Sequence, residues 1–180
     1  MRLHLLAWLL YGSMALGALG LGRYWHIALS WRCAGVPCSP LLSALAGLAL
    51  AALTVTLSRW AIRRGWLAEL HAWFSTVLGP LRWIDCASLA LASGIGEELL
   101  FRGVLQPRVG LLWASLIFGA VHVPPRRALW PWSVIAAVLG VALGAIFQVS
   151  GHLLGPILAH TLINFFNLHL VSRAPKGLTS

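Results

Sequence analysis

The chain has 180 residues, of which 59% are hydrophobic and only 9% are charged, whereas soluble domains carry about 25% charged residues. A chain this apolar cannot cover itself with a hydrated surface, so a soluble globular domain is excluded and a membrane is the expected solvent. The net charge of +9 is not accompanied by a basic face or a base-stacking module, so we expect anionic lipid headgroups rather than nucleic acid as the partner.

Six segments are apolar enough to be membrane-spanning helices, which need about 20 residues to cross a bilayer. In chain order they are 4–22, 39–58, 84–106, 110–123, 131–150 and 152–171. After the second segment, the stretch RWAIRRGWLAELHAWFSTVLGPLRW mixes arginines with tryptophans, which is typical of a helix lying along the headgroups. The predicted fold is an all-α polytopic membrane helical bundle with about six transmembrane segments and one interfacial amphipathic helix.

The distribution of basic residues predicts the orientation of this bundle. With six crossings, nine of the 13 Lys and Arg residues fall on the side that holds both termini, and four fall on the other side. Since Lys and Arg are enriched on the cytoplasmic side of membrane proteins, both termini are expected in the cytoplasm. Cys33 and Cys38 share a loop on the opposite side, where they could form a disulfide if that space is oxidising.

Two adjacent glutamates, Glu97 and Glu98, lie inside the third apolar segment. Ionisable side chains there cost about 2.5–3.5 kcal/mol each on insertion scales, so they mark functional candidates. Glu98 and Arg102 are four residues apart, on one helix face, and are predicted to form an ion pair. Glu97 is rotated by about 100° and has no such partner, which suits a general base or acid. The alternative is that both glutamates only hold Arg102 in place.

Three polar residues on two other segments reach a similar depth. His122 lies about 18 Å along a helix from the turn that follows the third segment, and Glu97 lies about 15 Å from that same turn. His160 lies about 13 Å from another turn on that side, and Asn164 follows it by one helical turn. The fourth segment is short and ends at VPPRR, which predicts a polar funnel that admits water near His122.

Three motifs carry a resemblance to a known family. EELLFR (97–102), FGAVH (118–122) and HTLIN (160–164) resemble, in order, the E-E-x-x-x-R, F-x-x-x-H and H-x-x-x-N/D motifs of the CPBP (CAAX protease and bacteriocin-processing, or Abi) membrane proteins. That family includes the type II CAAX prenyl endopeptidases. The resemblance covers residues 78–167 and implies an intramembrane endopeptidase. We therefore divide the single membrane domain into N-terminal membrane helices (1–60), an interfacial region (61–83) and a CPBP-type catalytic core (84–172).

The resemblance also implies roles for the candidate residues. Glu97 would activate the attacking water with help from His122, and His160 and Asn164 would stabilise the oxyanion. Glu98 and Arg102 would be the supporting ion pair. A second mechanism uses the same side chains, because two histidines and a carboxylate also form catalytic zinc sites. Glu97, His122 and His160 would then bind a divalent metal such as zinc, but H-E-x-x-H is absent and we favour a mechanism without a cofactor.

The expected partners are membrane lipids and a protein substrate that is anchored in the membrane or bears a membrane tail. The short six-segment plan resembles small bacterial members of the family, so the expected location is the bacterial plasma (inner) membrane and the expected substrate is a C-terminal sorting or processing tail. One alternative is a non-catalytic immunity or scaffold protein of the same family. A transporter is disfavoured because neither inverted repeats nor paired broken helices are visible.

Overall fold

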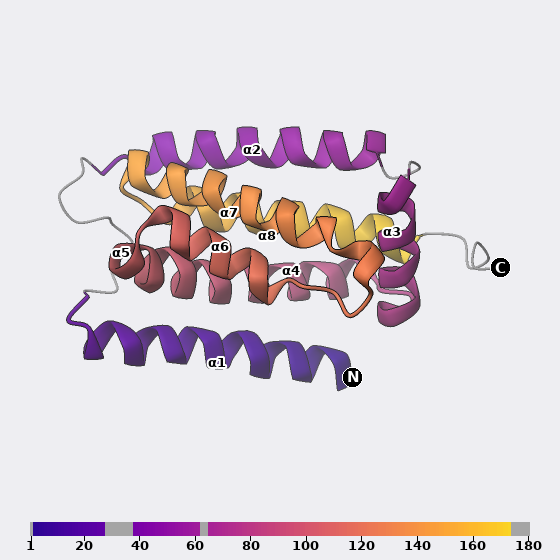
Figure 1. Ribbon diagram of the computed structural model, residues 1–180, viewed down its shortest axis with the longest axis horizontal. Helices are drawn as coiled ribbons and strands as arrows, with labels where there is room; N and C mark the ends of the chain where they lie inside the picture. Colours follow the sequence, from indigo (N-terminus) through magenta and orange to yellow (C-terminus); the bar gives the residue numbers. More distant parts are fainter. Residues whose placement is uncertain (1, 28–37, 62–64, 174–180) are drawn as a thin grey trace.

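The computed structural model describes residues 2–27, 38–61 and 65–173 (Figure 1). Over these ranges the chain forms helices and turns and no β-strand, so the predicted all-α fold is confirmed. The helices are α1 (Arg2–Tyr24), α2 (Pro40–Ala61), α3 (Gly65–Leu78), α4 (Trp83–Leu100), the π-helix η1 (Phe101–Leu105), α5 (Gln106–Val109), α6 (Leu111–Val121), the 3₁₀ turn η2 (Arg127–Leu129), α7 (Pro131–Ser150) and α8 (Leu154–Ser172).

The membrane-spanning segments agree with those predicted. Five helical stretches of the described chain are long and apolar enough to cross a membrane, and the longest, Trp83–Val121, contains two of the six predicted segments. The chain reverses between these two at Gly110, whose φ of +85° favours glycine (Figure 1). The second of the two, α6, has 11 residues and therefore extends about 17 Å, well short of a hydrocarbon core of about 30 Å.

The long helices form a bundle with α8 near its centre (Figure 1). Helix α8 packs against α2 on one side and α4 on the other, while α1 flanks α4 and α6 pairs with α7. The short helix α3 lies across the end of the bundle at which α1 begins and α8 ends, which is the position predicted for the interfacial helix. Within α3, the side chain of Leu70 is buried.

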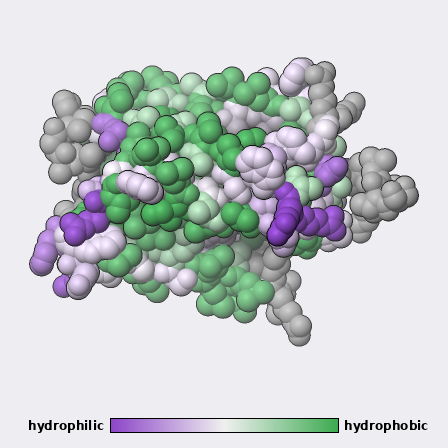
Figure 2. All heavy atoms as spheres, in the orientation of Figure 1, coloured by the Kyte–Doolittle hydropathy of each residue, from purple (hydrophilic) through white to green (hydrophobic). Residues whose placement is uncertain are grey.

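The surface of the bundle is that of a membrane protein. Large apolar side chains are exposed along its length, for example Leu16, Leu41 and Val149, which are each about 70% exposed. In Figure 2 hydrophobic residues cover the middle of the visible face, and the hydrophilic residues gather toward its two ends. This arrangement buries apolar side chains in lipid and leaves charged ones at the interfaces.

Small residues let the helices approach closely. This is usual in membranes, where helix association depends on close packing because lipid is as apolar as the helices themselves. Helix α2 meets α8 where Gly47 faces the backbone of Gly155, and a Cβ on either glycine would overlap the other helix. Beside this contact, Ser43 Oγ accepts a hydrogen bond from Gly155 N (2.8 Å) and donates one to the carbonyl of His152 (2.7 Å).

Two predictions are left untested by the fold. The proposed division at residues 60 and 83 stays a prediction. The possible disulfide involves Cys33, which lies outside the described residues.

Candidate active site

The two glutamates lie near the C-terminal end of α4, at the point where glycines bring neighbouring helices close. A Cβ on Gly94 would overlap Thr161 Oγ1 of α8 and lie 3.1 Å from the backbone nitrogen of Thr161. A Cβ on Gly96 would lie 2.6 Å from the carbonyl oxygen of Tyr11 in α1. The two glycines of Gly-Ile-Gly-Glu-Glu therefore let α8 and α1 approach α4 closely just before the two glutamates.

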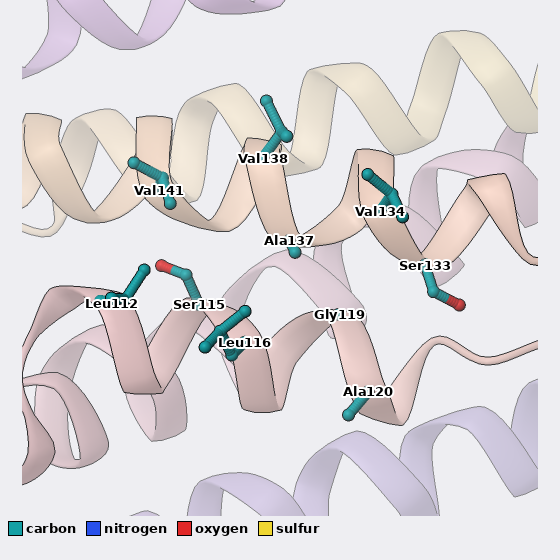
Figure 3. A pocket seen from close by; sticks show the side chains of 10 residues that line it. All are labelled: Leu112, Ser115, Leu116, Gly119, Ala120, Ser133, Val134, Ala137, Val138 and Val141. Carbon is teal, nitrogen blue, oxygen red and sulfur yellow. The ribbon is translucent and has the colours of Figure 1, made fainter.

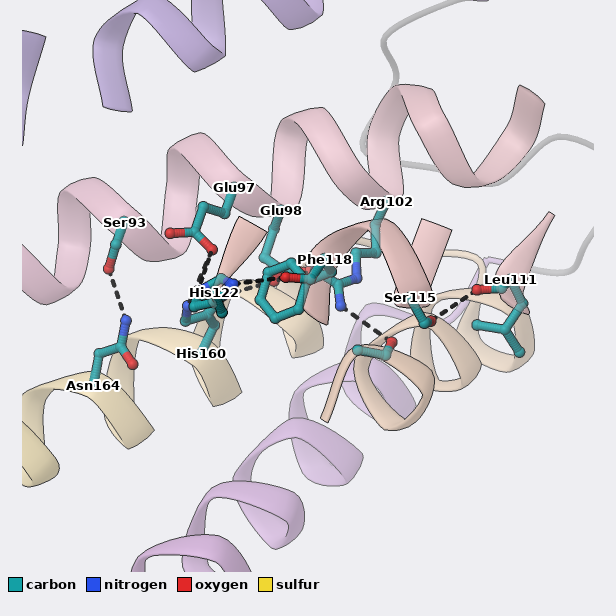
Figure 4. Close-up of polar contacts among 11 residues, drawn as sticks. Ser93, Glu97, Glu98, Arg102, Leu111, Ser115, Phe118, His122, His160 and Asn164 are labelled. Atoms are coloured by element: carbon teal, nitrogen blue, oxygen red, sulfur yellow. Dashed lines mark hydrogen bonds and ion pairs between the residues drawn. The ribbon is translucent and has the colours of Figure 1, made fainter. Parts of the chain in front are cut away.

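Glu98 is the centre of a buried ionic cluster (Figure 4). Its Oε1 accepts hydrogen bonds from Arg102 Nη1 (2.9 Å) and from His160 Nδ1 (2.7 Å), and the Glu98 side chain is fully buried. The predicted ion pair with Arg102 is present in the structure, and the bond to His160 joins α4 to α8. A buried charge is costly without a partner, and the residue Arg102 is only 1% exposed. The shared carboxylate of Glu98 balances the charge of its guanidinium.

Arg102 lies in the π-helix η1, a form of helix that is frequent at functional sites. Its Nη2 donates to the carbonyl of Gly140 in α7 (3.1 Å), so the guanidinium bridges two helices. The same group lies 4.5 Å from the centre of the Phe118 ring. The sequence pattern indicated the partner on the same helix, but a backbone carbonyl acceptor on α7 leaves no signature in a sequence.

Glu97 has a different environment. Its Oε2 lies 3.6 Å from His122 Nε2 and 3.9 Å from His160 Nε2, so residues from α4, α6 and α8 converge on one carboxylate oxygen (Figure 4). This oxygen is buried and has no hydrogen-bond partner within the described part of the chain. Separations of this size are too long for a direct hydrogen bond and are suited to a bridging water.

The hydrogen bonds of the two histidines fix which ring nitrogen carries a proton. His122 Nδ1 lies 2.7 Å from the carbonyl of Phe118, which can only accept, so Nδ1 is the donor and Nε2 is a free acceptor in the neutral ring. His160 Nδ1 likewise donates to Glu98. In both residues, therefore, Nε2 is the atom directed at Glu97 and available for chemistry.

The site is open at one side. His122 is the C-terminal cap of α6, and its side chain is 24% exposed, while those of Glu97 and His160 are each 7% exposed. The irregular segment that begins at His122 runs to η2. This geometry agrees with an approach for water past His122, although the predicted funnel toward Arg126 and Arg127 is itself untested.

Asn164 lies one helical turn beyond His160 on α8, and its Nδ2 donates to Ser93 Oγ (2.9 Å). Ser93 in turn precedes Glu97 by four residues on α4, so the pairs Ser93/Glu97 and His160/Asn164 face one another across the two helices (Figure 4). The three sequence motifs assign no role to Ser93. Its spacing from Glu97 on one helix face is a signal that could have indicated it.

Phe118 forms the apolar wall of the site. Its ring is tilted against that of His122 (centroids 4.5 Å apart) and meets that of His160 edge-on (5.9 Å). The guanidinium of Arg102 also lies against this ring, so Phe118 packs on the Glu98 cluster as well as on the two histidines. The F-x-x-x-H spacing that marked the motif thus has a physical reason, since it stacks the two rings on one face of α6.

The metal-dependent alternative would use the same three side chains. Glu97, His122 and His160 are the donor types of a catalytic zinc site. Yet over residues 2–27, 38–61 and 65–173 no group of three His, Cys, Asp or Glu side chains is arranged to hold a metal ion. We therefore derive the chemistry of the site from these side chains alone.

An apolar groove of about 430 Å³ lies elsewhere, between α6 and α7 (Figure 3). Leu112, Leu116, Val138 and Val141 line it, and each of these side chains is exposed. None of the candidate site residues contributes to its walls. The groove is therefore separate from the polar site and belongs to the surface that faces lipid.

Comparison with known proteins identifies the segment that holds the site. Residues 79–166, which include all six candidate residues, match the family described as type II CAAX prenyl endopeptidase Rce1-like. The match covers just under half of the chain, and this segment is similar to the Rce1-like family. The Rce1-like segment begins just before α4 and ends within α8, so α1 and α2 lie outside it.

The chain is also similar to the uncharacterized protein YpbD of Bacillus subtilis (strain 168). The two are 41% identical over 78 residues, which are 42% of this chain and 40% of that protein. This chain thus spans about two fifths of the length of the curated relative it matches. No solved structure matches the chain. The Rce1-like family is one of intramembrane proteases, so the comparison supports protease chemistry at the level of the family.

Proposed function

We propose that this protein is an intramembrane endopeptidase that hydrolyses a peptide bond near the C-terminal membrane tail of a protein substrate. The observation that carries the proposal is the buried Glu97 carboxylate, whose unbonded Oε2 faces the Nε2 atoms of His122 and His160. A carboxylate in such a place has no evident structural partner. It is suited to accept a proton from water inside an apolar protein.

Glu97 and His122 together orient the nucleophile. Glu97 Oε2 and the neutral His122 Nε2 are both acceptors, 3.6 Å apart, and two acceptors gain from a water that donates one hydrogen to each. The lone pairs of that water then point toward the substrate carbonyl. As the water oxygen attacks the carbonyl carbon, Glu97 takes one of its protons, and it later returns this proton to the leaving amine.

Stabilisation of the oxyanion is assigned to two residues of α8, His160 and Asn164. For His160 to stabilise the tetrahedral intermediate, its Nε2 must donate, which requires an imidazolium because Nδ1 already donates to Glu98. Glu98 and Arg102 support this form. With His160 protonated, two carboxylates and two cations balance in the buried cluster. Asn164 donates one amide hydrogen to Ser93 and has a second for the oxyanion.

The substrate we propose is a bacterial protein with a C-terminal sorting or processing tail, composed of a short recognition motif, an apolar transmembrane stretch and basic residues. The proposed location is the bacterial plasma membrane, with both termini cytoplasmic. The orientation is supported by arginines at the helix ends nearest α3, which in the described chain are Arg59 near the end of α2, Arg82 before α4, Arg126 and Arg127 at η2, and Arg173 after α8. The same arginines would meet anionic headgroups.

The proposal is tested with purified protein reconstituted in vesicles that contain anionic lipid. The probe is a reporter protein that ends in an apolar membrane-spanning tail followed by arginines. We expect the wild type to release the reporter with a new C-terminus near the tail, identified by mass, and the Glu97→Gln variant to leave it intact. Equal cleavage by the two proteins would contradict the proposed base. A Glu97→Gln variant that kept full biological activity would instead indicate a non-catalytic role.

A further inference from the structure

Ser93 of α4 is a buried residue, only 3% exposed, that bonds to the side chain of a candidate active-site residue. Its hydroxyl takes part in two hydrogen bonds. The oxygen accepts one from Nδ2 of Asn164 on α8 (2.9 Å) and the hydroxyl donates one to the carbonyl of Ala90 (3.1 Å). Ser93 thus links the amide of Asn164 to the backbone of α4, one helical turn before Glu97.

These two bonds impose a direction on the amide of Asn164. The carbonyl of Ala90 can only accept, so the single hydrogen of the Ser93 hydroxyl is used there. Ser93 is then left as an acceptor, and Asn164 must turn its nitrogen rather than its oxygen toward it (Figure 4). Without such a partner an amide can present either end, because its two ends are alike in shape and its terminal torsion is broadly two-fold.

We infer that Ser93 is a positioning residue, which fixes the amide of Asn164 so that its nitrogen, and not its oxygen, serves the oxyanion. The inference rests on the proposed function, in which His160 and Asn164 stabilise the oxyanion. After its bond to Ser93, the amide nitrogen has one hydrogen left to donate. An amide turned the other way would bring its partly negative oxygen to the developing oxyanion and oppose the reaction. Ser93 acts through Asn164 and does not itself contact the oxyanion.

The other proposed oxyanion donor is oriented in the same manner. Nδ1 of His160 donates to Oε1 of Glu98 (2.7 Å), just as Nδ2 of Asn164 donates to Ser93. Each of the two donors on α8 is therefore held by a side chain of α4, before any substrate is bound. Donors that are fixed in advance need no reorganisation during the reaction, which is the main advantage of an oxyanion site built by a protein.

The test is a double-mutant cycle on kcat and KM, measured with the tail reporter in vesicles. We expect Asn164→Ala to lower kcat about 10²-fold, as loss of an oxyanion donor does. Ser93→Ala should lower kcat about tenfold at unchanged KM, because the donor is still present but no longer held in place. In the Asn164→Ala background, Ser93→Ala should lower kcat no further, since no amide remains to be oriented.

Ser43→Ala is the matched control. Ser43 is also a buried serine that bonds to α8, where it accepts a hydrogen bond from Gly155 N (2.8 Å), but it contacts none of the candidate site residues. Its replacement should leave kcat unchanged. Ser93→Cys is a second variant that keeps nearly the size of the serine and retains a weak acceptor. Its kcat should lie between those of Ser93→Ala and the wild type.

An equal loss of kcat from Ser93→Ala in the wild-type and Asn164→Ala backgrounds would overturn the inference, because Ser93 would then act independently of the amide. Wild-type kcat in either single variant, Ser93→Ala or Asn164→Ala, would also overturn it. So would an equal loss in Ser43→Ala, since any lost bond to α8 would then suffice. Failure of the proposed function is distinguishable from these outcomes, because it would appear as cleavage by Glu97→Gln.

Discussion

His160 Nδ1 lies 2.7 Å from Glu98 Oε1, the same oxygen that accepts the hydrogen bond from Arg102. One carboxylate therefore orients the imidazole of α8 and balances the guanidinium of η1. This arrangement assigns the two adjacent glutamates to different tasks. Glu98 holds the cluster together, and Glu97 is left available for a reacting water.

Replacement of Glu98 by glutamine should destabilise the protein strongly. An amide cannot balance Arg102, whose guanidinium is buried, and loss of one partner from a buried ion pair costs about 3–5 kcal/mol. The measurement is denaturant or thermal unfolding in a fixed detergent. Glu97→Gln is the matched control and should change the free energy of unfolding by less than about 1 kcal/mol, because Oε2 of Glu97 has no hydrogen bond to lose and His160 can release its proton to keep the cluster balanced. Equal losses of unfolding free energy in Glu98→Gln and Glu97→Gln would contradict the different roles given to the two glutamates.

Replacement of Gly94 by alanine should disturb the alignment of α4 and α8. The new methyl group would meet Thr161 Oγ1, which can rotate, but also the Thr161 backbone nitrogen at 3.1 Å and Cα at 3.3 Å, which can only move with the helix. Since Thr161 adjoins His160, we expect kcat to fall about 10- to 100-fold, as small misplacements of catalytic groups do. Gly12→Ala is the control, because a Cβ there meets nothing within 4 Å. Full activity in Gly94→Ala would show that this close approach is dispensable.

Removal of divalent metals should leave the cleavage rate unchanged. The reason is that the described residues contain no group of three suitable side chains arranged around a common metal position. The measurement is cleavage of the tail reporter after treatment of the purified protein with a chelator, followed by dialysis. Loss of activity that zinc restores would instead favour the mechanism in which Glu97, His122 and His160 bind a metal.

Much of the fold is predictable from sequence because lipid imposes simple rules on it. Runs of apolar residues must become helices, since the backbone has no water to bond with, and the Arg- and Trp-rich stretch before α4 lies across the bundle end as predicted. The ion pair of Glu98 with Arg102 follows from helical spacing alone. Counting residues from the turns also indicated that Glu97, His122 and His160 reach one depth, and the structure brings their side chains together.

The rest of the site depends on contacts between helices that are distant in sequence. Nothing in the spacing of His160 indicates that its Nδ1 bonds to Glu98 while its Nε2 faces Glu97. The π-helical turn at Arg102 and the approach of Tyr11 to Gly96 are likewise set by packing, because they depend on the relative position of two helices. Helical periodicity specifies which face a residue occupies but not which residue of another helix it meets.

The most direct test of the central claim, that Glu97 is the base, is the single-turnover cleavage rate of Glu97→Gln with the tail reporter in vesicles. Glutamine preserves the shape of the side chain but cannot accept the proton of the attacking water. We predict a rate at least about 10²-fold below that of the wild type, in the range usual for loss of a general base, with an unchanged unfolding midpoint. A folded Glu97→Gln protein that cleaves the reporter within about threefold of the wild-type rate would contradict the account, since that factor is far below any general-base contribution.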